Sequence, residues 1–332
     1  MKRVLLTGAT GFVGGHILCH LYQAGYTIRA TYRTENFDEL RLICHYYNLD
    51  FTTLYEQIDW TRVDLLDRVA LDRACFDIDE VYHCAAIVNF DANRATHLTE
   101  TNLQSTQNIV DTCLRKSIHT LCYISSIGAL QGKRDTDGLT DESCFESKGP
   151  QASAYTQSKQ DAEKIVWEAI KQGLNTVILN PGIILGPGSL HKGGNLMIQK
   201  IKKGLFAYTN GTSGYVDVRD VANIALYCME HQLVNERYIC VSENLSYKSL
   251  FKTIRDTVGK KQPLIRVYKP LLYVALFGVK IANLFSKQKS AFTKATLQSS
   301  LKCNRYDNSK IRALLPFEFT PIAKTIADTT KA

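Results

Sequence analysis

The sequence predicts an α/β protein built on a doubly wound parallel sheet, with a smaller, mainly helical substrate lobe toward the C-terminus. In the first two thirds of the chain, short β-branched and apolar runs alternate with amphipathic stretches, which is the pattern of βαβ units. The chain has 332 residues, of which 45% are hydrophobic and 22% are charged, so it can bury a large core. Beyond residue 188 the pattern becomes irregular and rich in glycine, which indicates that the chain leaves the sheet.

Strands and helices are expected in alternation. The predicted strands cover residues 3–7, 27–32, 58–64, 80–84, 120–125, 175–180 and 238–241. The predicted helices cover residues 12–25, 99–116 and 152–172, and Gly25 and Gly173 stand where the first and the third should end. Residues 215–230 resemble a short strand and a helix that return to the first domain. We therefore expect a first domain of residues 1–180 plus 213–243, and a second lobe of residues 181–212 plus 244–332; the motifs described below predict that the first binds a dinucleotide and the second a substrate.

Composition excludes several classes of protein. The formal net charge is +8, but Lys and Arg are spread along the chain, so no nucleic-acid surface is expected. The ten cysteines show no pair at metal or redox spacing, which indicates reduced thiols, no bound metal and a cytoplasmic protein. The apolar stretch at residues 271–285 is shorter than the roughly 20 residues that span a bilayer, so no membrane contact is expected.

A glycine-rich turn, "TGATGFVG", separates the first predicted strand from the first predicted helix. Gly8 allows a tight turn, Gly11 lets the backbone approach a pyrophosphate, and Gly14 lets the helix pack closely on the strand. The helix N-terminus, with Thr10, Phe12 and Val13, offers free N–H groups and a positive dipole end to phosphates. Turn glycines alone are weak evidence, but the strand before and the helix after them favour a dinucleotide site of the Rossmann type.

The end of the second predicted strand bears on the choice of cofactor. "TYRTE" places Arg33 where many dinucleotide folds carry the carboxylate that binds a ribose 2′-OH. Arg33 can pair with a 2′-phosphate, so NADP(H) is preferred and NAD(H) is the alternative; a surface salt bridge is the other interpretation of Arg33. Asp64 and Leu65 close the third predicted strand, where a carboxylate can accept the adenine amino group.

Hydroxyl and amine groups follow in the second half of this domain. "YISS" ends a strand with Ser125 and Ser126, at the edge where a parallel sheet binds ligands, although such a pair is also a common helix cap. In "YTQSK", Tyr155 and Lys159 share one face of a predicted helix. A tyrosine has an unperturbed pKa of about 10, and a nearby ammonium and an oxidised nicotinamide both stabilise its phenolate. The phenol can then exchange a proton with a carbonyl oxygen while hydride is transferred at the carbon.

Together with "VYHCAA", "TNLQSTQN", "NPGIILGPG" and "YVDVRDVA", these motifs resemble the extended short-chain dehydrogenase/reductase family, also described as the NAD-dependent epimerase/dehydratase family. They occur in the family's order over residues 1–229. "SSIGAL", Arg33 and "YDNSKI" most resemble its dihydroflavonol reductase-like and 3β-hydroxysteroid dehydrogenase-like branch. Asn180 departs from the family pattern, in which an arginine is common before Pro-Gly, and Tyr215 replaces a usual phenylalanine.

The resemblance implies the roles of individual residues. Ser126 would polarise the carbonyl, Tyr155 would be the acid/base, and Lys159 would bind the ribose and tune Tyr155. Backbone or side-chain contacts with the dinucleotide would come from Cys84, Ala85, Ala86, Asn102, Pro181 and Gly182. The family often forms dimers through helices beside the sheet, so a homodimer is one expectation.

The expected function is an NADP(H)-dependent oxidoreductase that reduces a ketone or aldehyde of a small, fairly apolar molecule, or oxidises the alcohol. A nucleotide-sugar epimerase or dehydratase that retains NAD would use the same serine, tyrosine and lysine. A third alternative is a non-catalytic NADP-binding sensor or scaffold, which has no need for an activated phenol.

Overall fold

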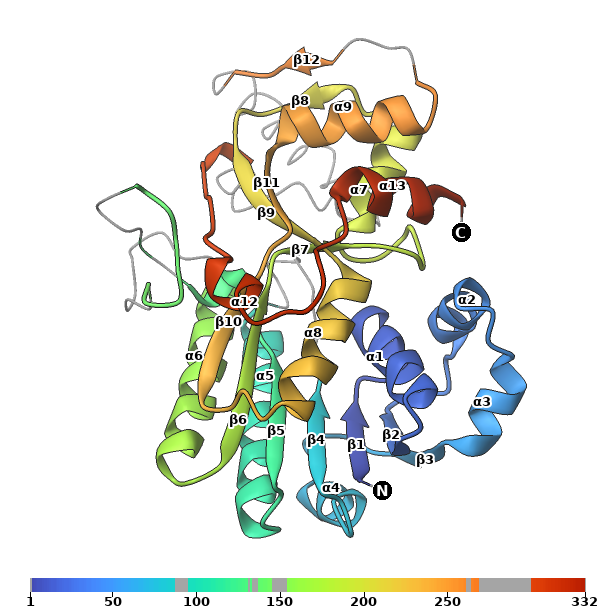
Figure 1. Cartoon of the computed structure of the whole chain (residues 1–332), viewed down its shortest axis with the longest axis vertical. Coiled ribbons are helices and arrows are strands. Elements are labelled where there is room, and N and C mark those ends of the chain that lie inside the picture. Colours follow the sequence, from blue (N-terminus) through green and yellow to red (C-terminus); the bar gives the residue numbers. More distant parts are fainter. Residues whose placement is uncertain are drawn as a thin grey trace.

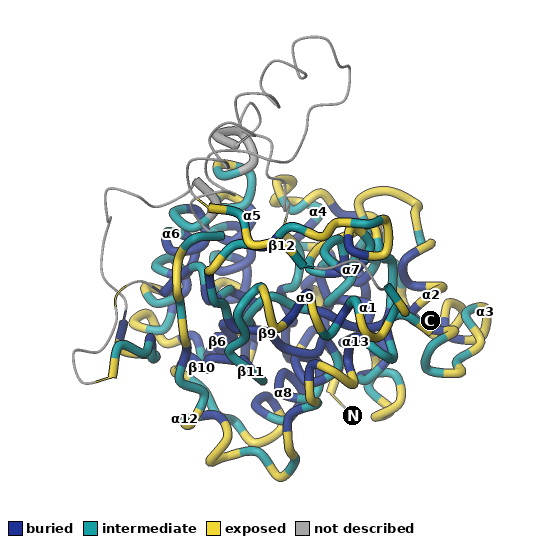
Figure 2. Tube along the Cα trace, turned by 90° about the horizontal axis from the view of Figure 1, so that it is seen from above, coloured by how far each residue is buried: buried dark blue, intermediate teal, exposed yellow. Residues whose placement is uncertain are grey.

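A computed structural model describes residues 2–86, 95–130, 132, 137–144, 154–260, 264–268 and 300–331, while the side chains of residues 95–98, 154 and 155 lie outside the description. Figure 1 shows a large sheet flanked by helices, from which the chain rises into a second group of smaller elements. Figure 2 shows buried positions through the middle of the molecule and exposed positions at its rim, for example around α3.

The large sheet has seven strands, and all of its pairings are parallel. Its order is β10-β6-β5-β4-β1-β2-β3, so the winding direction reverses between β1 and β4. The strands are β1 (Arg3–Thr7), β2 (Thr27–Tyr32), β3 (Asp59–Arg62), β4 (Glu80–His83), β5 (Thr120–Ile124), β6 (Asn175–Pro181) and β10 (Glu236–Cys240). This order confirms the predicted doubly wound Rossmann-type α/β fold, in which ligands bind at the carboxyl edge beside the reversal point.

The two faces of the sheet are covered by different helices because successive strand residues point to opposite sides. Val4 and Leu6 of β1 belong to one core cluster, and Leu5 between them belongs to the other. The first cluster includes residues of α1 (Phe12–Gln23), α2 (Asp38–Tyr46), α3 (Phe51–Gln57) and α8 (Val218–Glu230). The second includes residues of α4 (Arg68–Ala74), α5 (Ala95–Arg115) and α6 (Ala154–Lys171). The central strands β4 and β5 are therefore buried on both faces, as is typical of a parallel sheet, whereas the edge strand β3 is partly exposed.

A second group of elements has its own apolar core. It contains a three-stranded sheet, ordered β11-β9-β7, and a two-stranded sheet of β12 and β8. Its elements are β7 (Ile183–Leu185), α7 (Asn195–Lys202), β8 (Ala207–Tyr208), β9 (Thr212–Asp217), β11 (Glu243–Ser246), α9 (Tyr247–Thr257), β12 (Ile265–Arg266) and α13 (Ile322–Lys331). The core joins Ile198 of α7, Leu250 of α9 and Ile326 of α13. In Figure 1 these elements lie beyond the carboxyl ends of the sheet strands, while the short α12 (Ser309–Arg312) lies beside β10.

The loop that follows β7 is attached to the N-terminal helices. His16 of α1 is fully buried and its Nε2 donates a hydrogen bond of 2.9 Å to the carbonyl of Pro187. The buried carboxylate of Glu39 in α2 accepts the Ser189 backbone N–H at 2.8 Å and pairs with Lys192 at 3.2 Å. Burial lowers the pKa of His16 to about 3, so the imidazole is neutral and these contacts persist at physiological pH.

The predicted strands at residues 3–7 and 27–32 have the observed bounds, and the third strand is shorter than expected, at Asp59–Arg62. α2, α3 and α4 were not predicted from the sequence. No helix in the described part of the chain has both the length and the apolar character needed to cross a membrane. The apolar stretch at residues 271–285 lies outside the described residues.

Candidate active site

The turn between β1 and α1 depends on two glycines. Gly8 has a φ of +75°, and a Cβ there would lie 2.7 Å from the backbone N of Ala85 after β4. A Cβ on Gly14 would lie 2.1 Å from the Gly8 carbonyl oxygen, so no side chain fits between α1 and the turn. The Gly11 N–H donates to the same oxygen at 2.9 Å. The turn therefore brings the N-terminus of α1 against the carboxyl edge of the sheet, where free N–H groups suit an anionic ligand.

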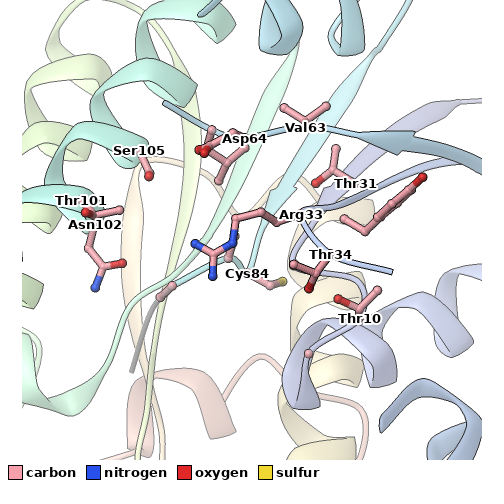
Figure 3. A pocket seen from close by; sticks show the side chains of 16 residues that line it. Thr10, Thr31, Arg33, Thr34, Val63, Asp64, Cys84, Thr101, Asn102 and Ser105 are labelled. Atoms are coloured by element: carbon pink, nitrogen blue, oxygen red, sulfur yellow. The ribbon is translucent and has the colours of Figure 1, made fainter. Parts of the chain in front are cut away.

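A cavity of about 260 Å³ opens beside this turn, next to the point where the winding of the sheet reverses. It is bounded by the carboxyl ends of β1, β2, β3 and β4 and by α5 (Figure 3). Ten of the predicted cofactor-binding residues line it: Gly8, Thr10, Gly11, Arg33, Asp64, Leu65, Cys84, Ala85, Ala86 and Asn102. Residues that are far apart in the sequence, such as Gly8 and Asn102, therefore meet around one hollow, as expected for a ligand site in this fold.

Arg33 extends into this cavity from the end of β2. Figure 3 shows its guanidinium in the middle of the hollow, with Thr10 and Thr34 on one side and Asn102 on the other. Within the described part of the chain, the guanidinium makes no ion pair or hydrogen bond. The alternative interpretation of Arg33, a surface salt bridge, thus has no partner among these residues. Asp64 uses one carboxylate oxygen to accept the Leu66 N–H at 3.0 Å, which fixes the loop after β3.

The end of β4 is held by a buried hydrogen-bond chain. The Thr7 hydroxyl lies 2.8 Å from His83 Nδ1 and accepts the Ala85 N–H at 3.3 Å. Burial, followed by the charge of Lys159, lowers the pKa of His83 to about 3, so the ring is neutral. A neutral ring needs no counter-ion, and the backbone at Cys84 and Ala85 is fixed against the glycine-rich turn.

The two serines after β5 have different environments. Ser125 is buried, and its hydroxyl donates a 2.5 Å hydrogen bond to the Glu163 carboxylate of α6. Ser126 is half-buried; its hydroxyl accepts the Gly128 N–H at 3.0 Å and caps the short helix η1 (Ile127–Ala129). No described residue accepts the Ser126 hydroxyl proton. The helix-cap interpretation of Ser126 is confirmed, and the same hydroxyl retains a proton for a further acceptor.

Lys159 lies on α6, which packs against η1, and Tyr155 occupies the first turn of the same helix. The Lys159 side chain is only 8% exposed. Burial lowers its pKa from 10.5 to about 8, and the Glu163 carboxylate and the Cys84 thiol oppose this shift. A buried ammonium is therefore held close to its titration point beside the carboxyl ends of β4 and β5. The Tyr155 side chain lies outside the described residues.

The sequence matches the family described as "NAD dependent epimerase/dehydratase family" over residues 4–240. The chain belongs to this family. The predicted membership of the extended short-chain dehydrogenase/reductase family is thereby confirmed.

Known members of the epimerase/dehydratase family resemble most of the chain. Cinnamoyl-CoA reductase 1 of Petunia hybrida is 26% identical over 99% of this chain and 91% of its own length. Dihydroflavonol 4-reductase of Gerbera hybrida is 26% identical over 76% of this chain and 72% of its own length. The crystal structure of gox2253 has a TM-score of 0.80 at 24% identity, covering 100% of this chain and 97% of that one. Gre2 of Candida albicans, solved with NADPH, has a TM-score of 0.75 at 21% identity, covering 100% and 98%.

Several cavity residues of this family member were not predicted from its sequence. Thr101 and Ser105 are one turn apart on α5, so both reach the cavity. Their sequence contained a signal for this position, because the motif "TNLQSTQN" begins at Thr101, close to the predicted start of the helix. The others are Thr31, Tyr32, Thr34 and Val63, which lie beside Arg33 and Asp64 at the ends of β2 and β3.

Other predicted site residues lie next to the cavity without lining it. Phe12 and Val13 begin α1, and Gly14 lies beneath the turn. Pro181 ends β6, and a Cβ on Gly182 would lie 2.6 Å from the Gly214 carbonyl oxygen, where β7 and β9 meet. Pro181 and Gly182 therefore shape the path of the chain from the large sheet into the second group of elements.

Proposed function

We propose that this protein is an NADP(H)-dependent oxidoreductase that reduces the ketone or aldehyde of a small, fairly apolar molecule, or oxidises the alcohol. The observation that carries the proposal is the arrangement around the cavity. Arg33 lies in it with no anionic partner among the described residues, and Ser126 and Lys159 lie farther along the same edge of the sheet. An NADP-type phosphate fits the first feature, and acid/base chemistry on a carbonyl fits the second.

Each candidate catalytic residue has a distinct task in this proposal. The bound dinucleotide supplies the hydride that is added to the carbonyl carbon. Ser126 donates its free hydroxyl proton in a hydrogen bond to the carbonyl oxygen, and Tyr155 transfers its phenolic proton to that oxygen as the alcohol forms. Lys159 binds the ribose and stabilises the phenolate left on Tyr155. Oxidation of the alcohol reverses these proton transfers.

We further propose that residues 181–212 and 244–332 form the substrate lobe, while residues 1–180 and 213–243 hold the cofactor. The separate core around Leu250 and Ile326 supports a second lobe, while β9 (Thr212–Asp217) pairs with β7 and β11 in that lobe's sheet and so crosses the proposed boundary. The names of the relatives, cinnamoyl-CoA reductase and dihydroflavonol 4-reductase, support a carbonyl reductase acting on an aromatic molecule. Cinnamaldehyde, an aromatic aldehyde, serves as a first carbonyl probe for this proposal.

The released nucleotide distinguishes a reductase from an epimerase. The purified protein is denatured, the nucleotide in the supernatant is identified by mass spectrometry, and NADPH oxidation is followed with cinnamaldehyde and a panel of aryl ketones. Exchangeable NADPH binding and carbonyl-dependent oxidation support the proposal. Stoichiometric retained NAD, without turnover of any carbonyl, would contradict it and favour the epimerase alternative.

Arg33→Asp is expected to reverse the cofactor preference. The substitution removes a charged hydrogen-bond donor worth about 1.5–3 kcal/mol and places a carboxylate where it repels a phosphate, so NADPH affinity should fall at least about tenfold. Affinity for NADH should be retained or rise, because a carboxylate accepts the ribose hydroxyl. Titration of protein fluorescence with each cofactor measures both effects.

Arg62→Asp is the matched control, because Arg62 ends the adjoining strand β3 and does not line the cavity. It changes the net charge by the same amount. An equal loss of NADPH affinity in both variants would mean that bulk charge sets the preference and would remove Arg33 from the site.

A further inference from the structure

A buried carboxylate lies one helical turn beyond Lys159, outside the cavity. The Glu163 side chain has an exposed fraction of 0%. Its Oε2 accepts the Ser125 hydroxyl at 2.5 Å and the Asn180 side-chain amide at 2.8 Å. Its Oε1 forms an ion pair with Arg237 at 3.2 Å and accepts the Trp167 indole N–H at 3.4 Å. One carboxylate thus joins α6 to three neighbouring strands of the sheet, β5, β6 and β10.

Such a carboxylate is costly unless it is fully compensated, because burial removes the hydration of both the acid and its cation. Here the compensation is extensive: the guanidinium of Arg237 is 8% exposed and lies 4.9 Å from the centre of the Trp167 ring. Glu142 and Glu236 also act electrostatically on Arg237. Hydrophobic side chains of similar volume could replace the Glu163–Arg237 pair without loss of folding stability, so the charged cluster needs an explanation beyond packing.

The first explanation is the position of the serines. Glu163 fixes Ser125, the residue immediately before Ser126. Asn180, which donates to Glu163, also donates to the Ser126 carbonyl oxygen at 3.0 Å from the same amide nitrogen. The backbone on both sides of the Ser126 side chain is therefore tied to α6, the helix that carries Tyr155 and Lys159. The Glu163 carboxylate therefore helps to fix the distance between Ser126 and α6.

The second explanation is the charge on Lys159. Residues four apart on a helix lie on the same face, and the Glu163 carboxylate acts electrostatically on the Lys159 ammonium, although the two form no ion pair in the described part of the chain. Burial lowers the pKa of Lys159 to about 8, and Glu163 is the largest influence in the opposite direction. The other groups that face Lys159 contribute less charge: His83 is neutral, and burial raises the pKa of the Cys84 thiol far above physiological pH.

We propose that Glu163 is a positioning residue of the candidate active site, which holds the Ser126 strand end against α6 and keeps Lys159 charged at neutral pH. Arg237 and Asn180 complete this role by holding the carboxylate in place. The inference rests on the proposed function, because it assigns a task to Glu163 through Ser126 and Lys159.

Glu163→Gln tests the inference because it keeps the shape of the side chain and removes its charge. In the wild type, kcat/KM with NADPH and cinnamaldehyde should fall as the pH rises through about 8, where Lys159 loses its proton. In the variant, this alkaline limb should move to lower pH, because the negative charge that stabilises the ammonium is absent. We also expect kcat at the optimum to fall roughly tenfold as Ser126 becomes less well placed.

A second readout needs no turnover. The affinity for NADPH, measured by fluorescence titration across the same pH range, should weaken at a lower pH in Glu163→Gln than in the wild type. Glu168→Gln is the matched control, because Glu168 lies on the same helix, is exposed, and pairs only locally with Lys171. It should leave both pH profiles unchanged. Glu163→Asp should restore the alkaline limb but not kcat, since it returns the charge on a shorter side chain.

Loss of stability must be separated from loss of position. Glu163→Gln removes the ion pair between Glu163 and the buried Arg237, so the double variant Glu163→Gln with Arg237→Met removes both charges of that pair and should recover part of any loss in Tm. The shift in the pH profile should persist in the double variant. If the Tm changes while both pH profiles stay at the wild-type position, Glu163 is structural only and the inference fails. If the wild type oxidises NADPH with none of the carbonyl compounds, the proposed function itself fails, which is a distinguishable result.

Discussion

Tyr155→Phe is expected to lower kcat for carbonyl reduction by roughly 10²- to 10⁴-fold, the range that positioned proton donors contribute. Phenylalanine keeps the ring and removes the phenolic proton of Tyr155, which lies in the first turn of α6. NADPH affinity should change little, because most of the predicted cofactor-binding residues line the cavity and, of the proposed contact at Tyr155, phenylalanine loses only the hydroxyl. Stopped-flow measurement of NADPH oxidation under single-turnover conditions reports the chemical step directly.

Tyr55→Phe is the control for that experiment. Tyr55 lies on α3 with 39% of its surface exposed, far along the chain from the candidate catalytic residues. Its loss of a hydroxyl should leave turnover unchanged. Wild-type rates in Tyr155→Phe would show that another group delivers the proton, and Ser126 and Lys159 would then need separate substitution.

Gly14→Ala is expected to lower the free energy of unfolding by about 3 kcal/mol, the upper end of the usual cost of overpacking, and to abolish measurable NADPH binding. The new Cβ would lie 2.1 Å from the oxygen and 2.6 Å from the carbon of the Gly8 carbonyl. Both are backbone atoms, so relief requires α1 to move away from the turn that forms the phosphate end of the cavity. Urea unfolding measures the first effect and fluorescence titration with NADPH the second.

Gly15→Ala is a closely matched control, because it adds the same methyl group one residue later in the same helix. Its Cβ would lie 2.7 Å from the Ile43 Cδ1 atom, the far end of a flexible side chain that can change rotamer. The gain in helix propensity, about 1 kcal/mol, offsets this cost. We expect near-wild-type stability and binding. Equal effects of the two substitutions would contradict the assigned contact of Gly14.

The sequence predicts the sheet well because its signals are local. Apolar runs such as residues 120–125 are buried on both faces, so composition and length suffice to find them. α3 and α4 were missed because each has only seven residues, too few for a helical period to stand out. A weaker signal was present, since Asp50 and Asp67 cap these helices with their side chains.

The candidate site is predictable only in part, for a related reason. Gly8, Gly14 and Arg33 belong to motifs at fixed offsets from strand ends, so the fold carries them to the cavity without knowledge of packing. The Glu163 cluster depends on the register between β5, β6 and β10, which pairs Ile239 with Asn180 across strands that are distant in sequence. No pattern along the chain encodes that register, because it is set by the packed sheet.

The loop after β7 has a consequence for how the molecule opens. Pro187 and Ser189 are bound by His16 of α1 and Glu39 of α2, although the loop leads into the second group of elements. Local unfolding proceeds in cooperative units that share contacts, and this loop shares its contacts with the N-terminal helices. In native-state hydrogen exchange, the Ser189 amide should therefore exchange together with the amides of α1, and later than those of α7, which packs in the other core. The entrance to the second lobe would then belong to the folding unit of the glycine-rich turn.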